Sequence, residues 1–98
     1  MSAELTLPNL APHLNTTFRL SSAPGLVVEL ELTEVRDHGS TPRHEQFSAM
    51  FRGPLHAFLP QGMYELEHAS LGAQALFLVP VAQRKDGFEY QAVFNRFR

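Results

Sequence analysis

Five histidines are the residues of this 98-residue chain best suited to chemistry near neutral pH. His38 and His44 lie in a polar stretch, residues 37–45, where Asp37 and Glu45 are possible co-ligands for a metal ion. No known metal-ligand spacing is matched there, and a polar loop of this length collects such residues in any case and holds ligands poorly. We therefore expect no metal site and no cofactor.

His68 is a different case, because it lies on an apolar strand face with Tyr64 and Leu66. One interpretation makes it a general base or a pH sensor. The other makes it a core or subunit-contact histidine that is hydrogen-bonded to the backbone or to a tyrosine hydroxyl. No Ser or Thr nucleophile with an acidic partner stands at a motif spacing from it, so we favour the structural interpretation.

Two carboxylate pairs, Glu29 with Glu31 and Glu65 with Glu67, have the i, i+2 spacing of side chains on one strand face. A glycosidase also uses two carboxylates. Strand alternation produces such pairs automatically, however, and a solvated face explains both. The glycines belong to no phosphate-binding loop. We expect no catalytic residues and no enzymatic activity.

Composition narrows the class of protein further. The chain has the length of one domain, residues 1–98, and 44% of its residues are hydrophobic. The net charge of −2, with only eight basic residues, argues against nucleic-acid binding. There is no cysteine and no apolar run of membrane-spanning length, and the N-terminus lacks the pattern of a secretion signal. A cytoplasmic location is the expectation.

The hydrophobic pattern predicts an all-β fold after a helical lead-in. In residues 1–14, Thr6 can cap a short helix that holds Pro8 in its first turn, with leucines 7, 10 and 14 on one face. Strands are then expected at 16–20, 26–33, 46–52, 63–70, 75–81 and 88–95, with a β-bulge near 33–34. Six strands at roughly ten-residue spacing favour a small antiparallel barrel or sandwich over residues 15–98.

Glycine and proline mark where these strands turn. Gly72 suits a hairpin position with positive φ, and Lys85-Asp86-Gly87 predicts a second hairpin. Pro80 places an edge or a bulge at the far end of strand 75–81.

Strand 75–81, with the sequence ALFLVPV, is apolar on both sides. The chain can wrap around both faces if this is a middle strand of a closed barrel. Alternatively Phe77, Val79 and Val81 form an interface, since exposed apolar area usually marks association. Covering both faces is difficult in so small a domain. We therefore expect a protein partner or a homo-oligomer, and a structural or interaction module as the function.

A small-ligand binder is the alternative. In that case Tyr64, His68 and Tyr90 would line a pocket in the barrel interior or at its mouth.

The second half of the chain also contains a series of short sequence motifs. They are FSAMFRGP (47–54), LPQGMYELEH (59–68), LG (71–72), LFLVPV (76–81) and YQAVFNR (90–96). In this order the motifs resemble the signature of a small bacterial family of unknown function. The resemblance implies a compact β domain without known catalytic residues. It also implies a role as an accessory of a phage-tail-like assembly.

Overall fold

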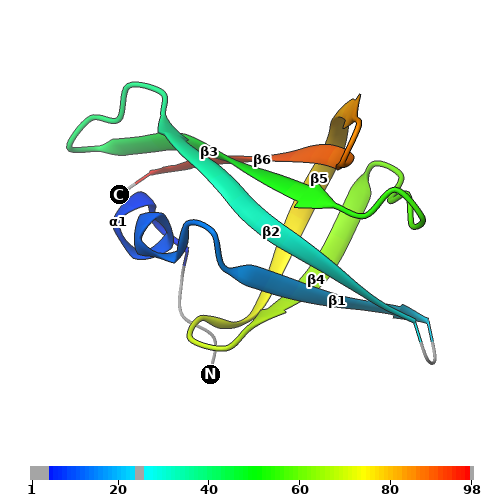
Figure 1. Ribbon diagram of the computed structural model, residues 1–98. Helices are drawn as coiled ribbons and strands as arrows, with labels where there is room; N and C mark the ends of the chain where they lie inside the picture. The colour runs from blue at the N-terminus through cyan, green and yellow to red at the C-terminus, as the bar shows by residue number, and fades with distance from the viewer. Residues whose placement is uncertain (1–4, 24–25, 98) are drawn as a thin grey trace.

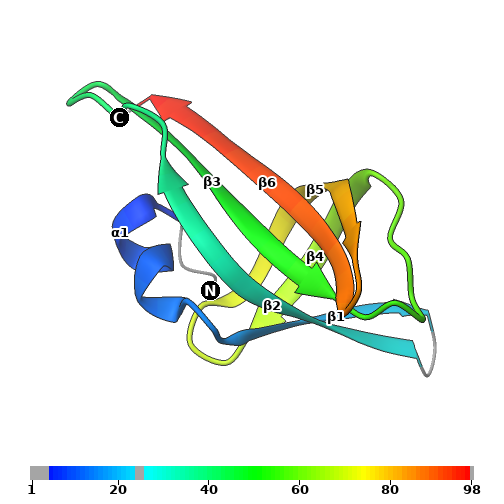
Figure 2. The ribbon, with the colours of Figure 1, turned by 45° about the horizontal axis from the view of Figure 1, so that its top comes forward.

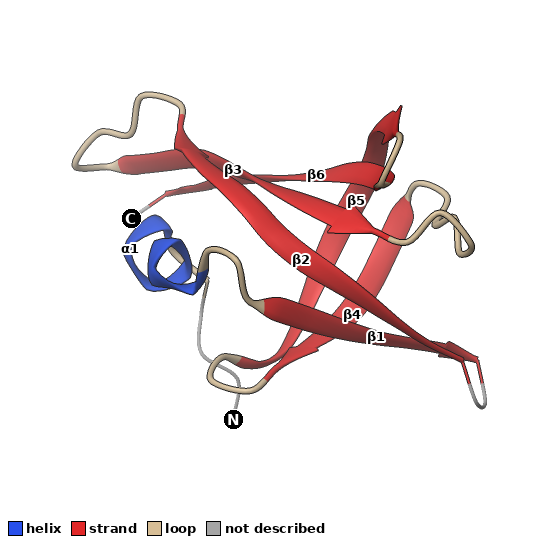
Figure 3. Ribbon diagram, viewed as in Figure 1, coloured by secondary structure: helices blue, strands red, loops and turns tan. Residues whose placement is uncertain are grey.

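The computed structural model describes residues 5–23 and 26–97, and it consists mainly of β-strands (Figures 1 and 3). One antiparallel sheet closes into a barrel with the strand order β1-β2-β3-β6-β5-β4. The fold is therefore all-β as predicted, and of the two predicted architectures, barrel and sandwich, it is the barrel. Its strands are β1 (Thr17–Ala23), β2 (Leu26–Asp37), β3 (His44–Gly53), β4 (Gly62–His68), β5 (Gly72–Arg84) and β6 (Gly87–Phe97).

A short helical lead-in precedes the barrel, as predicted. Helix α1 (Leu7–Leu10) is followed at once by the 3-10 turn η1 (Ala11–His13). The Thr6 hydroxyl accepts the N–H of Asn9, and the Asn9 side chain accepts the N–H of Thr6, which forms a capping box. Leu10 is fully buried, whereas Leu14 lies beyond η1 and is exposed, because the helix ends before it.

Two long strands bend so that the sheet can close. The first part of β2 pairs with β1 and its second part with β3, with a register shift between Leu32 and Glu34. This is the bulge that the break in alternation predicts. The first part of β5 pairs with β4 and its last part with β6, with a shift between Pro80 and Ala82. A bulge bends its strand and increases its twist, which lets a six-stranded sheet curl into a ring.

The inward-facing side chains fill the barrel. Phe18 and Phe51 meet edge to face with ring centroids 5.2 Å apart, and both are fully buried. Toward the loop that joins β3 to β4, Leu59 is buried and its N–H donates to the Tyr90 hydroxyl at 3.0 Å. The rest of the buried apolar core comes mainly from Leu20, Val28, Leu30, Leu32, Phe47, Ala49, Leu66, Leu76, Leu78 and Ala92.

The strand pairs differ greatly in length. β3 and β6 share ten residue pairs, whereas β1 and β4 share one pair in the described residues, Arg19↔Glu67. The ring is therefore held by a long ladder between β3 and β6 and by a very short one between β1 and β4. We call the β1–β4 pairing the seam.

The predicted turns lie where glycine is required. Gly72 has a φ of 75°, which supports the predicted hairpin position. Gly87 follows the second hairpin turn, and a Cβ there would lie 2.5 Å from the carbonyl oxygen of Gly53. Several boundaries differ from the prediction: β1 continues to Ala23, β2 extends to Asp37, β5 runs from Gly72 to Arg84, and β4 ends at His68 instead of residue 70. The longer strands arise because ladder pairing continues past the polar residues.

Candidate functional site

His68, at the end of β4, is a buried titratable side chain whose two ring nitrogens both have hydrogen-bond partners. It is only 8% exposed, and its Nδ1 accepts the N–H groups of Ser70 at 3.0 Å and Leu71 at 3.2 Å. Its Nε2 lies 2.9 Å from the Thr16 hydroxyl, which itself donates to the carbonyl of His13 at 2.5 Å. His68 therefore connects the β4–β5 turn to the segment that leads into β1.

These contacts require a neutral imidazole. Because Nδ1 accepts two N–H groups, the ring proton resides on Nε2 and is donated to Thr16. Burial lowers the pKa of His68, and the neighbouring His13 lowers it further. Both ring nitrogens are occupied, so the geometry supports a structural histidine rather than a general base.

A surface groove of about 570 Å³ lies beside this histidine. Its charged groups are Arg19, Glu29 and Glu67, and Arg19 pairs with Glu29 at 3.3 Å. That ion pair is solvent-exposed, so it contributes at most about 1 kcal/mol. The Thr16 hydroxyl in the groove donates to the backbone carbonyl of His13 and accepts from His68, so the imidazole is not placed to take its proton in this arrangement.

The structure does not bring Tyr64, His68 and Tyr90 together around one cavity. Tyr90 is fully buried, its hydroxyl accepts the N–H of Leu59, and burial raises its pKa. Tyr64 lies on β4 near the same loop, where its hydroxyl donates to the carbonyl of Pro60 at 2.5 Å.

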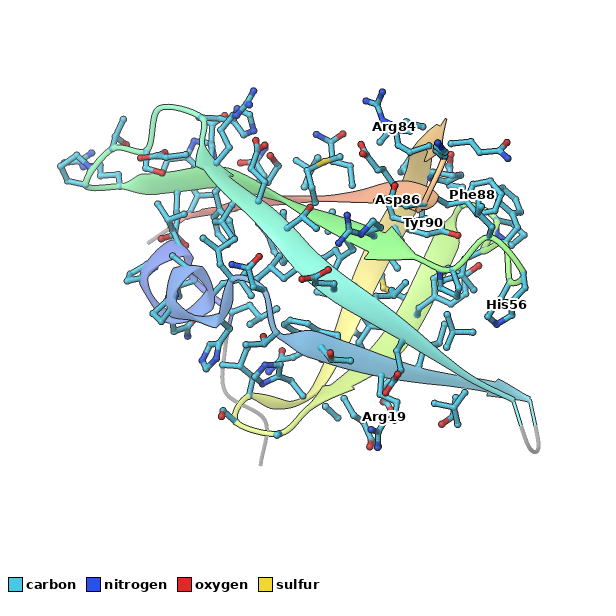
Figure 4. The ribbon with its side chains drawn as sticks, in the orientation of Figure 1. Arg19, His56, Arg84, Asp86, Phe88 and Tyr90 are labelled. Atoms are coloured by element: carbon cyan, nitrogen blue, oxygen red, sulfur yellow. The ribbon has the colours of Figure 1, made fainter. Side chains whose placement is uncertain are left out.

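His68 instead lines the groove at another side of the barrel. Figure 4 places Tyr90 well away from Arg19, which lines that groove too. Core side chains fill the space in which a ligand would join the three residues.

The histidines of the polar connection also have separate roles. The His38 Nε2 lies 2.7 Å from the Ser48 hydroxyl, whereas His44 contacts Asn95 and stacks on Phe97. Within residues 5–23 and 26–97, no group of three His, Cys, Asp or Glu side chains is arranged to hold a metal ion.

The outer face of β4 and β5 carries exposed apolar side chains, and those on β5 belong to the interface predicted from the sequence. Phe77 is 46% and Val81 47% exposed, while Val79 between them is half-buried. Met63 of β4 pairs directly with Phe77 and is 65% exposed. We call Met63, Phe77, Val79 and Val81 the outer apolar face.

The sequence pattern did not identify Met63 as part of the outer apolar face. It alternates with Glu65 and Glu67, so its face is typical of a solvated one. Only the register, which sets Met63 against Phe77, shows that the apolar face continues onto β4.

Comparison with protein-family models identifies a family for this chain. A family model described as a domain of unknown function, DUF6916, matches residues 5–94. The chain belongs to this family. The DUF6916 match covers nearly the whole barrel, and it confirms the resemblance to a family of unknown function. No curated protein and no solved structure matches the chain.

No helix in the described part of this DUF6916 chain has both the length and the apolar character needed to cross a membrane.

Proposed function

We propose that this DUF6916 domain is a non-catalytic structural module that associates with further copies of itself through the outer apolar face. The observation that supports the proposal is the exposure of Met63, Phe77 and Val81 on two paired strands. Apolar surface of this kind, contiguous on a rigid sheet, is typical of association sites.

The size of the outer apolar face sets the expected free energy of association between two copies. Full burial of a large apolar side chain is worth about 1.5–3 kcal/mol, so each of these half-exposed side chains contributes on the order of 1 kcal/mol. Met63, Phe77 and Val81 of two copies then supply roughly 6 kcal/mol. Association costs about 4–15 kcal/mol in lost rigid-body freedom. The contact is therefore weak by itself and depends on concentration.

Weak contacts suit a particle in which many identical subunits support one another. The sequence resemblance implies an accessory of a phage-tail-like assembly, and a self-associating barrel is compatible with such a role. This extension rests on the resemblance alone.

Light scattering coupled to size-exclusion chromatography over a range of concentrations tests the proposal. The wild-type chain should show a mass that rises with concentration, and Phe77→Lys should shift the distribution toward the single chain. Val27→Lys is the matched control, because Val27 is 50% exposed on β2, outside the outer apolar face. A wild-type chain that stays monomeric throughout, or an equal effect of both substitutions, would contradict the proposal.

A further inference from the structure

Along the last half of β6, one edge of the strand has no strand partner among the described residues. The β5–β6 ladder stops at Val79↔Gln91, so residues 92–97 pair with β3 alone in the described part of the chain. Figure 2 shows this half of β6 at the outside of the sheet. Such an edge presents a row of backbone N–H and C=O groups that can pair with another strand.

The usual protections of an edge strand are missing on the outer face here. Proteins shield their edges with charges, prolines, bulges or short strands. The β3–β6 ladder runs through ten pairs without a register shift, and residues 92–97 contain no proline. On the outer face Val93 is 67% exposed and Phe97 is 84% exposed, with the uncharged Asn95 exposed between them.

We infer that this edge pairs antiparallel with the same edge of a second copy of the chain. Side chains that oppose each other across an antiparallel pair must lie on the same face. When Asn95 faces its counterpart in the second copy, Val93 faces Phe97 at both ends of the contact. This register buries two exposed apolar side chains of each copy and brings no like charges together on the outer face.

Other self-pairings are less favourable. A shift of two residues toward the start of β6 would set Val93 against Asn95 and would need Gln91, which already pairs with Val79. Pairing through the β4 edge at the seam would place the outward carboxylates of Glu65 and Glu67 against those of the second copy. Like charges directly opposite one another destabilise a strand pair, so charge selects β6.

The edge contact extends the proposed function with a second surface, and its geometry does not use the outer apolar face. The two-fold axis of an antiparallel edge pair is perpendicular to the sheet, so β6 of both copies shows its outer face on the same side. A subunit with two separate self-contacts forms assemblies larger than a dimer.

Cysteine cross-linking tests the contact cleanly, because the chain contains no cysteine of its own. In the inferred register residue 95 faces its own counterpart, so Asn95→Cys should form a disulfide-linked dimer under mild oxidation. Val27→Cys, at an exposed strand position away from β6, is the matched control and should remain a single chain. Adding Val93→Lys to Asn95→Cys should abolish the cross-link, since it sets a lysine beside Phe97 of the partner subunit.

The same cross-link in a Phe77→Lys background separates the two surfaces. Cross-linking that persists there supports the edge contact, whatever happens to the larger assembly. If Asn95→Cys cross-links while Phe77→Lys leaves the assembly unchanged, the edge contact stands and the proposed function fails. Cross-linking of Asn95→Cys that does not exceed that of Val27→Cys, or that disappears with Phe77→Lys, overturns the edge contact.

Discussion

Replacing His68 by asparagine and by glutamine separates the two halves of its hydrogen-bond network. The asparagine Oδ1 can occupy the place of Nδ1 and still accept the N–H groups of Ser70 and Leu71, but it cannot reach Thr16. The glutamine amide can occupy the place of Nε2 and keep the Thr16 contact, but it leaves both N–H groups without their acceptor.

The expected costs differ because Leu71 is buried. Losing the bond to Thr16 costs about 1 kcal/mol of folding free energy. Losing the acceptor of the buried Leu71 N–H costs about 1–3 kcal/mol, because water does not replace it readily. Both variants also lose the packing of the imidazole against Phe18, with ring centroids 4.5 Å apart. His68→Gln should therefore be the less stable variant.

The pH dependence of stability gives an independent check. Because the pKa of His68 is lowered in the folded state, the unfolded state binds more protons in the interval between the lowered pKa and the unfolded value of about 6.5. The stabilising contribution is complete above about pH 6.5 and is lost as the pH falls toward the lowered pKa.

Urea unfolding at several pH values measures both effects. The wild-type chain should lose stability between pH 7 and pH 5, and His68→Asn should lose less. The reasoning is refuted if His68→Gln is at least as stable as His68→Asn at pH 7, or if both variants keep the acid sensitivity of the wild type.

Three further substitutions probe contacts in the core and the lead-in. Gly87→Ala should destabilise the fold by about 1–3 kcal/mol, because its Cβ would overlap the carbonyl of Gly53; an unchanged urea midpoint would contradict this close approach. Tyr90→Phe removes the acceptor of the Leu59 N–H and should cost about 1–3 kcal/mol; thermal unfolding checks it, and a rise in the midpoint would count against it. Thr6→Ala should cost about 1 kcal/mol and speed amide exchange at Asn9, whereas unaltered exchange would show that the cap is unimportant.

The fold could be predicted because most strands have one buried and one exposed face. Alternation in β2 located its core residues, and the break in that alternation located the bulge before Glu34. Gly72 and Pro80 marked a turn and a bend for steric reasons that hold in any sequence context.

The candidate sites were less predictable, because they depend on which strands become neighbours. Nothing local indicates that Met63 pairs with Phe77, or that β5 and β6 diverge beyond Val79. Tyr64, His68 and Tyr90 point inward as predicted, but Tyr64 and Tyr90 lie near the loop that joins β3 to β4, whereas His68 lies at the opposite end of β4. Alternation gives the side of the sheet on which a residue lies, and the position around the ring comes from strand order.

The narrow join between β1 and β4 has a mechanical consequence. In the described part of the chain, separating these two strands breaks fewer ladder pairs than separating any other neighbouring strands, so the ring is weakest at Arg19↔Glu67. When the barrel opens, β1 and β4 should separate first, while β2, β3 and β6 stay paired with one another. The hydrogen bonds of His68 lie at one end of this join and connect β4 to the segment that leads into β1, so they should oppose its opening.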